Sequence, residues 1–229
     1  MASRIVFLPT TQDESALFTE QLVSFEWVPG MAISQGTKSV LNLHATAKEQ
    51  LGISQILEIS TRSQEHFGIS LSAFNLQVQV ATKTVSVEVA YQSSKVFSGG
   101  GPYLDLLEGS SMEAKQDSRI KTSGELQEFE FEGIRWPLNG NPNFYDYLYI
   151  RGLANNPGSE NLLKYEAFTD IAFNQNRTKK SIKKSFNCQA RSAAIYCSLI
   201  KRMKSSQVLD FLMELSKIDE KKPEQLGLF

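Results

Sequence analysis

The spacing of hydrophobic and polar positions along this 229-residue chain predicts both strands and helices. Residues 3–8 and 21–28 form short apolar runs that end at proline or at a proline–glycine pair, which is typical of strands. Residues 55–60 alternate between apolar and polar positions, and residues 129–132 do so strictly. The sequence therefore predicts four short strands.

Helical spacing of apolar residues predicts most of the remaining elements. Ser34 is expected to cap a helix from about Gly36 to Leu51. Residues 98–124 are expected to form a long loop with one short helix, and residues 70–81 give no clear pattern. Further helices are predicted at residues 85–97, 143–153, 159–165, 187–203 and 206–218.

The order of these elements indicates the fold class and the domain organisation. Runs of helices with scattered strands favour an α+β fold over regular βαβ winding. We expect one mainly helical domain over residues 1–218, because a chain of this length can bury one sizeable core. Residues 219–229 follow as a flexible tail.

Charge and composition narrow the classes of function. The chain has 24 Lys and Arg against 25 Asp and Glu, so no overall basic field attracts nucleic acid. A local patch remains, because residues 174–186 contain no acid. Four lysines in this segment are predicted to follow a DNA backbone, with a solvated loop as the alternative: Lys179, Lys180, Lys183 and Lys184.

The residue types that bind metals and cross membranes are scarce. Two cysteines and two histidines cannot supply a zinc site. No apolar run approaches the roughly 20 residues that cross a bilayer, and the N-terminus has no signal-peptide pattern. The sequence therefore predicts a cytoplasmic protein with no metal and no cofactor.

The helix predicted at residues 85–97 is the first place to look for chemistry. Glu88, Gln92 and Lys95 are spaced at i, i+4 and i+7, so they share one helical face. Gly99-Gly100-Gly101 and Pro102 end the helix. An acid, an amide and an amine in line can form the wall of a polar pocket, although a solvated face with an ion pair has the same pattern.

These residues also carry a resemblance to a known family. Glu88–Phe97 resembles the Glu-His-x-Phe-Gln-x-x-Lys-Phe signature of the NADAR family, which includes YbiA-like N-glycosidases. Other segments between residues 3 and 203 are similar to the branch of NADAR antitoxins paired with DarT toxins: residues 25–30, 35–40, 71–76, 100–107, 144–149, 167–174 and 187–194. The chain departs from the family at Val89-Ala90-Tyr91 and in a longer, more basic segment over residues 176–186.

The resemblance implies an enzyme that removes ADP-ribose from a guanine amino group in DNA. Its expected partners are ADP-ribosylated DNA and the DarT-type toxin that installs the group from NAD. Two alternatives stay open. The first is a non-catalytic antitoxin that binds its toxin, and the second is a YbiA-like enzyme acting on small phosphoribosylated intermediates.

Cleavage of an N-glycosidic bond indicates which side chains would act. The leaving nitrogen needs a proton, and the positive charge growing at the sugar carbon needs a partner. Glu88 is predicted for acid–base work, and Asp170 for stabilising the sugar carbon or placing water. The resemblance also implies that Lys38 forms an imine with the opened ribose. We therefore expect Lys38, Glu88 and Asp170 to converge on one sugar carbon.

The remaining ligand-binding predictions follow from the parts of ADP-ribose and guanine. Gly100 and Gly101 permit close approach of phosphate, and Trp27, Trp136 and Tyr145 can stack on a base, although tryptophans are as often core residues. Four amide side chains can form hydrogen bonds with ribose hydroxyls or with guanine: Gln35, Gln92, Asn187 and Gln189. Two cations, Lys95 and Arg191, can pair with phosphate.

The end of the chain carries a separate motif. Gln225-Leu226-Gly227-Leu228-Phe229 resembles the peptide by which bacterial replication proteins dock on the sliding clamp. Leu226, Leu228 and Phe229 can fill an apolar pocket while Gln225 fixes the register. The alternative is a frayed terminus that matches by chance.

Overall fold

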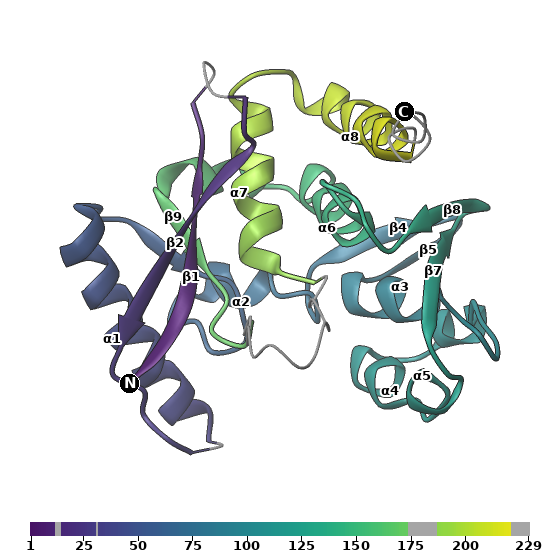
Figure 1. Cartoon of the computed structure of the whole chain (residues 1–229), viewed down its shortest axis with the longest axis horizontal. Coiled ribbons are helices and arrows are strands. Elements are labelled where there is room, and N and C mark those ends of the chain that lie inside the picture. The colour runs from purple at the N-terminus through teal and green to yellow at the C-terminus, as the bar shows by residue number, and fades with distance from the viewer. Residues whose placement is uncertain (12–14, 31, 174–186, 221–229) are drawn as a thin grey trace, which may run out of the picture.

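A four-stranded sheet forms one half of the molecule. The computed structural model describes residues 1–11, 15–30, 32–173 and 187–220, with side chains as far as residue 215. The strand order is β2-β1-β9-β3 (Figure 1). An antiparallel hairpin of β1 (Ala2–Pro9) and β2 (Phe18–Phe25) is extended by β9 (Ala167–Thr169) and β3 (Ile56–Glu58), which are parallel to each other.

Helices cover both faces of this sheet. Successive strand residues point to opposite faces, so Val6 packs in one cluster with Val40 and Leu43 of α1 (Ile33–Leu51). Phe7 points the other way, into the main core that includes α7 (Gln189–Ile200). The strands β3 and β9 are thus buried on both sides and their ends lie between the two layers, whereas most residues of the edge strand β2 are exposed.

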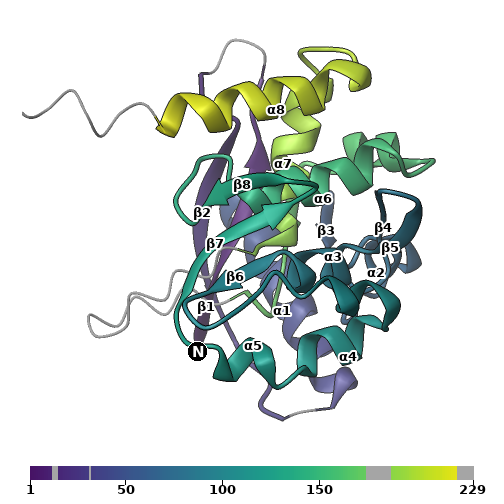
Figure 2. The same cartoon turned by 90° about the vertical axis from the view of Figure 1, so that its right-hand side faces the viewer.

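The other half of the molecule is built from shorter elements around a large core. Aromatic rings fill its centre, where Phe144 stacks on Phe129 with ring centroids 4.8 Å apart. The helices of this half are α2 (His66–Ser70), α3 (Val87–Ser93), η1 (Leu104–Glu108), α4 (Ser111–Gln116), α5 (Arg119–Thr122), α6 (Phe144–Ala154), η2 (Ser159–Lys164) and α8 (Ser205–Glu220). The strands are β4 (Gln77–Val80), β5 (Lys83–Ser86), β6 (Lys95–Phe97), β7 (Leu126–Phe131) and β8 (Ile134–Pro137), and Figure 2 shows β6, β7 and β8 side by side.

The predicted α+β class is confirmed, with many helices and a few short strands. Strands were correctly predicted at β1, β2, β3 and β7, although β2 begins and ends three residues earlier than expected. The helices α1, α6, α7 and α8 were also predicted. The segment predicted at residues 159–165 is a 3₁₀ helix, and α8 continues to Glu220, past the expected boundary of the tail.

The helix predicted at residues 85–97 was wrong at both ends. Ser86 ends β5 and caps α3, because its Oγ accepts a hydrogen bond from the Val89 amide at 3.2 Å. Lys95 belongs to β6, which pairs with β7. The β-branched residues Val85 and Val96 lie in the two strands, where their stiff side chains fit better than in a helix.

Two further expectations were wrong, and three strands were not predicted. Residues 98–124 contain three short helices, η1, α4 and α5, rather than one. Ser34 does not cap α1, because Ala32 holds that position. The strands β4, β5 and β8 were not predicted, since their hairpins turn at Ala81 and at Glu132-Gly133, where φ is positive.

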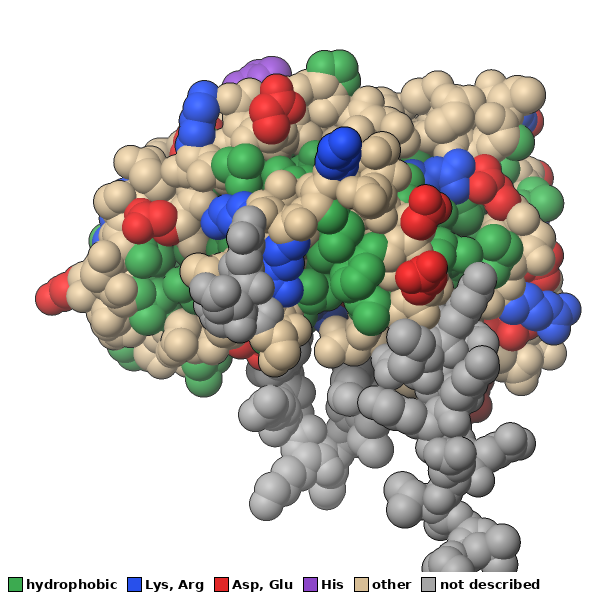
Figure 3. Space-filling model, turned by 90° about the horizontal axis from the view of Figure 1, so that it is seen from above, with side chains coloured by type: hydrophobic (Ala, Val, Ile, Leu, Met, Phe, Trp, Pro, Cys, Tyr) green, Lys and Arg blue, Asp and Glu red, His purple; other side chains and the backbone are tan. Residues whose placement is uncertain are grey.

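The distribution of charged side chains on the surface agrees with the near-neutral net charge of the chain. On the face seen in Figure 3, acidic and basic side chains are spread among apolar and polar ones. Among the helices that the structure describes, none is long and apolar enough to cross a membrane.

Candidate active site

Glu88 lies in the first turn of α3, and only 3% of its surface is exposed. Its Oε1 accepts a hydrogen bond from Gln92 Nε2 at 3.0 Å, as the i, i+4 spacing predicted. Lys95 Nζ donates to Gln92 Oε1 at 2.7 Å from the adjoining strand β6. The structure therefore brings the predicted acid, amide and amine into one chain of contacts.

The Lys95 amine is unusual for a lysine. Burial lowers its pKa to about 8, with the Glu88 carboxylate opposing this change and Lys115 adding to it. The ammonium also lies 4.8 Å from the centre of the Tyr91 ring. A lysine in this position holds a usable fraction of neutral amine near neutral pH, which nucleophilic chemistry requires.

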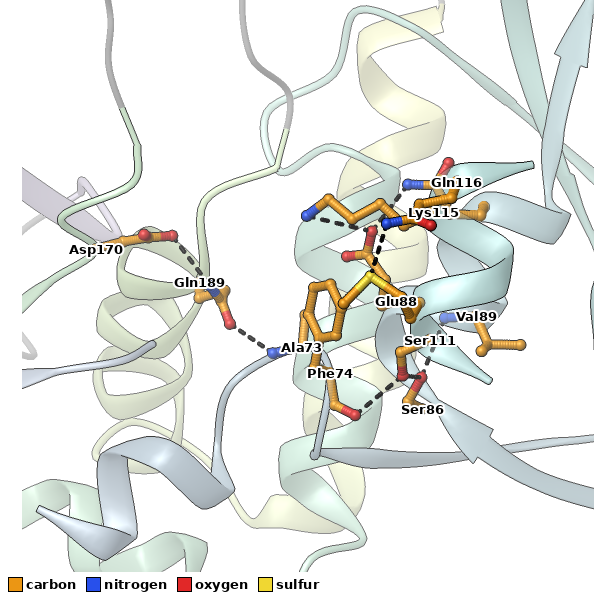
Figure 4. A network of polar contacts seen from close by, with 12 residues as sticks. Ala73, Phe74, Ser86, Glu88, Val89, Ser111, Lys115, Gln116, Asp170 and Gln189 are labelled. Atoms are coloured by element: carbon orange, nitrogen blue, oxygen red, sulfur yellow. Dashed lines mark hydrogen bonds and ion pairs between the residues drawn. The ribbon is translucent and has the colours of Figure 1, made fainter. Parts of the chain in front are cut away.

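Lys115 approaches Glu88 from the other side, and the sequence did not single it out. Its Nζ lies 3.8 Å from Glu88 Oε1 and 4.6 Å from the centre of the Phe74 ring. Figure 4 shows Lys115 and Phe74 beside the carboxylate. Ser110 and Glu113 form a capping box that starts α4. This sequence pattern indicates a short helix but does not reveal the element against which the helix packs.

Asp170 follows strand β9 and is also buried. Its Oδ2 accepts a hydrogen bond at 3.1 Å from Nε2 of Gln189, the first residue of α7. Its Oδ1 accepts from the Ala172 amide at 3.2 Å. Burial raises the pKa of Asp170 above its ordinary value.

One residue, Ala73, lies between the segments that carry the two carboxylates. Gln189 Oε1 accepts a hydrogen bond from the Ala73 amide at 2.5 Å, and the Ala73 carbonyl accepts one from the Glu88 amide at 2.9 Å. Figure 4 shows Asp170 and Glu88 on the two sides of this segment. The Asp170 side chain is thus linked by a short chain of hydrogen bonds to the backbone of Glu88, a residue 82 positions away in sequence.

A second buried carboxyl lies in the strand next to Asp170. Glu58 accepts hydrogen bonds from Ser60 Oγ at 2.6 Å, Thr169 Oγ1 at 2.6 Å and the Ile171 amide at 2.9 Å. Burial, and then the Asp170 carboxylate, raise its pKa to about 7. The sequence signal for this group was a single acid in the apolar strand Ile56-Leu57-Glu58-Ile59.

His44 completes this network without adding a charge. Its Nε2 lies 2.8 Å from Thr169 Oγ1, and burial, assisted by Lys48, lowers its pKa to about 4. The threonine hydroxyl therefore lies between a neutral imidazole and Glu58. It can donate to the carboxylate when Glu58 is ionised, or accept from the carboxyl and donate to the imidazole when Glu58 is protonated.

We expect Glu58→Gln to change how stability depends on pH. In the folded wild type the Glu58 carboxyl has a pKa of about 7, compared with its ordinary pKa of 4.5. The folded protein therefore binds this proton more tightly than the unfolded chain does. The stabilising contribution of the carboxyl is complete below pH 4.5 and is lost as the pH rises through 7, by on the order of 3 kcal/mol. Urea unfolding of both proteins from pH 4 to 8 measures the difference, and Glu125→Gln serves as an exposed control. Parallel curves for wild type and Glu58→Gln would contradict the assignment.

Lys38 lies on the solvent side of α1. The buried residues of this helix include Gly36, Val40 and Leu43, and the rotation of 100° per residue places Lys38 opposite them. Among the contacts of the described residues, no hydrogen bond or ion pair joins Lys38 to Glu88 or Asp170. Hydrogen bonds link Asp170 to the backbone of Glu88 through Gln189 and Ala73, whereas the convergence of Lys38, Glu88 and Asp170 on one sugar carbon stays a prediction.

Several predicted ligand residues have structural partners. Gln35 Oε1 accepts from the Ala32 amide at the start of α1, at 3.0 Å. The Arg4 guanidinium carbon lies over the Trp27 ring, 5.1 Å from the ring centre. Trp136 and Tyr145 are almost fully buried in the core, so stacking on a base would require a rearrangement of their surroundings.

Arg191 is bound within the protein rather than presented to solvent. Its Nη2 lies 3.0 Å from Asp146 Oδ2, and its Nε donates to Oδ1 at 3.2 Å. Asp146 also accepts from Ser192 Oγ at 2.8 Å. This pair connects α6 to α7 and holds the end of the helix that carries Gln189.

The glycine run bends the chain beside Lys95. Gly101 has φ of +98°, and a Cβ there would lie 2.3 Å from the Lys95 carbonyl oxygen. Gly100 has φ of +152° and closely approaches Tyr103. The glycine run therefore lies beside Lys95, as a phosphate-binding role would require. Close packing also requires glycine here, because a side chain at Gly100 or Gly101 would clash with Tyr103 or with the Lys95 carbonyl.

The remaining predictions have less structural detail. Asn187 precedes α7 and is half-buried. The predicted DNA-binding lysines and the predicted clamp-binding peptide lie outside the described residues, at 174–186 and 221–229. In the part of the chain that the structure describes, no group of three or more His, Cys, Asp or Glu side chains could hold a metal ion.

Comparison with known proteins identifies the family of the chain. A search of the curated proteins finds no match to the chain. A family model described as the DarT1-associated NADAR antitoxin matches residues 2–225. The match places the chain in the class of NADAR proteins, which are N-glycosidase-like in general. The chain belongs to the family of DarT1-associated NADAR antitoxins, which confirms the resemblance of its motifs.

Proposed function

We propose that this antitoxin hydrolyses the N-glycosidic bond between ADP-ribose and a guanine base of DNA, in the cytoplasm, and so reverses the modification made by a DarT-type toxin. The observation that supports this most is that two buried acids, Glu88 and Asp170, lie in segments that are hydrogen-bonded to each other: Asp170 accepts from Gln189, Gln189 accepts from the Ala73 amide, and the Ala73 carbonyl accepts from the backbone amide of Glu88. Paired carboxylates in a partly dry site suit glycosidic cleavage, because both the leaving group and the sugar carbon need charge compensation.

In the proposed reaction the Glu88 carboxylate takes up a proton from solvent when the substrate binds and passes it to the guanine nitrogen as the bond to the sugar carbon breaks. Asp170 stabilises the positive charge at that carbon and orients water, which adds to the carbon and returns a proton to a carboxylate. The products are free ADP-ribose and the restored guanine amino group. Gln92 and Gln189 hold the two carboxylates in place by hydrogen bonds.

A covalent route through lysine has two candidates. The family resemblance implies Lys38, whereas the buried amine next to Glu88 belongs to Lys95. In this route the amine adds to the opened sugar carbon, the guanine amine leaves with a proton from Glu88, and water hydrolyses the resulting imine. Lys95 is favoured by its burial and lowered pKa, and Lys38 by its motif.

A guanine-ADP-ribosylated oligonucleotide tests the proposal directly. We expect the protein to release free ADP-ribose from it and to leave the DNA strand intact. Borohydride present during turnover would reduce an imine, and mass spectrometry of the digested protein would show whether Lys38 or Lys95 carries the adduct. Unmodified oligonucleotide is the control.

The outcomes separate the routes. No release of ADP-ribose by the wild type would contradict the proposed function. Release without any adduct would leave the two-carboxylate route and exclude an accumulating imine. The DNA contacts of Lys179–Lys184 and clamp docking by residues 225–229 stay predictions of the sequence.

A further inference from the structure

Lys115 is a charged neighbour of Glu88 that the proposed reaction does not use. Within the described residues, the single carboxylate of Glu88 faces two ammonium groups, those of Lys95 and Lys115. Lys95 donates its hydrogen bond to the neutral amide of Gln92. The cluster therefore has one positive charge more than it has negative charges, which favours an anion nearby.

The backbone that carries Lys115 is fixed while its ammonium is not. Ser111 Oγ donates to the Phe74 carbonyl at 3.0 Å and lies 2.6 Å from Ser86 Oγ at the start of α3 (Figure 4). The Lys115 side chain is 52% exposed, and its ion pair with Glu88 is long, at 3.8 Å. Such a half-exposed pair contributes little stability, so the ammonium can leave Glu88 at small cost.

The position of Lys115 also suits a ligand that bridges the two carboxylates. Phe74, over which the ammonium lies, follows Ala73, which joins Glu88 to Asp170. A sugar held between the carboxylates would carry its attached phosphate past this solvent-facing amine. Lysine is a common phosphate ligand because its compact charge needs no fixed orientation.

We propose that Lys115 binds a phosphate group of the substrate and exchanges Glu88 for it when the substrate arrives. This inference rests on the proposed function. The phosphate belongs either to the pyrophosphate of ADP-ribose or to the DNA backbone next to the modified base. In both cases the exchange releases Glu88 from its ion pair at the moment when it must reach the leaving nitrogen.

Binding measurements on the full chain test this proposal. Lys115→Met keeps the stem that covers Phe74 but removes the charge, and Lys115→Arg keeps the charge. Lys121→Met, at an exposed position of the neighbouring helix α5, is the matched control. We expect Lys115→Met to weaken binding of ADP-ribose, measured by titration calorimetry, by roughly tenfold or more. Lys115→Arg should restore most of it, and Lys121→Met should bind as the wild type does.

A second ligand identifies the source of the phosphate. An unmodified single-stranded oligonucleotide that loses affinity in Lys115→Met, while ADP-ribose does not, assigns the contact to the DNA backbone. Unchanged affinity for both ligands would overturn the proposal, as would an equal loss in Lys115→Met and Lys115→Arg. Failure of the wild type to bind ADP-ribose would instead count against the proposed function, and the pyrophosphate contact would fall with it.

Discussion

Replacing Glu88 by glutamine is expected to slow the release of ADP-ribose by about 10²- to 10⁴-fold, the range typical of general acid–base catalysis. Glutamine has nearly the same shape and keeps one oxygen to accept the Gln92 hydrogen bond. It cannot supply a proton to the guanine nitrogen. The loss should therefore lie in the chemical step, so that kcat falls more than KM changes.

Single-turnover assays on a guanine-ADP-ribosylated oligonucleotide measure this effect. Glu125→Gln removes an acid from an exposed position and should react as the wild type does. A melting temperature close to that of the wild type shows that Glu88→Gln is folded. A folded variant with undiminished rate would remove Glu88 from the mechanism.

The same variant separates the two kinds of antitoxin. If cells that produce the toxin survive with Glu88→Gln as well as with the wild type, the protein neutralises its toxin by binding. We expect the variant to lose protection, because unreversed guanine modification accumulates on the DNA. Equal amounts of both proteins in the cells are required for this comparison.

Removing the Asp146 carboxylate is expected to have the largest effect on stability, about 3–5 kcal/mol for Asp146→Ala. Only 1% of its surface is exposed. The carboxylate accepts hydrogen bonds from Arg191 and Ser192, and it also belongs to the capping box of α6. Alanine leaves the guanidinium without its carboxylate in a buried position. It also removes the acceptor for the Asn143 amide at the start of the helix.

Urea denaturation at neutral pH measures the free energy of unfolding for this comparison. Asp210→Ala removes an exposed aspartate from α8 and should change the free energy by no more than about 0.5 kcal/mol. If Asp146→Ala were as stable as this control, the contacts of Asp146 with Arg191 and Ser192 would not stabilise the fold.

Local patterns predicted the site only where the chain itself sets the geometry. Glu88 and Gln92 are four residues apart on one helix, so their contact follows from helical spacing. Lys95 was assigned to the same helix and was found in a strand, because β-pairing with β7 outweighs helical spacing there. The amine still reaches Gln92, since the chain turns back immediately after α3.

Contacts between distant segments could not be predicted in this way. Lys115 meets Glu88 because serine hydroxyls attach α4 to the Phe74 segment and to the cap of α3. Burial, and then the approach of Asp170, raise the pKa of Glu58, and both arise when β3 pairs with β9. Conversely, Arg191 was predicted as a phosphate ligand because the sequence does not reveal its partner on α6.

The hydrogen bonds on either side of Ala73 have a mechanical consequence. Because its amide and its carbonyl are both engaged, the Asp170 side chain and the backbone of Glu88 are held against one peptide segment rather than in two separate lobes. A hinge motion that parted them would have to break the hydrogen bonds on either side of Ala73. In the proposed reaction the two acids are therefore in place before any nucleotide arrives, and little binding energy is spent on arranging them.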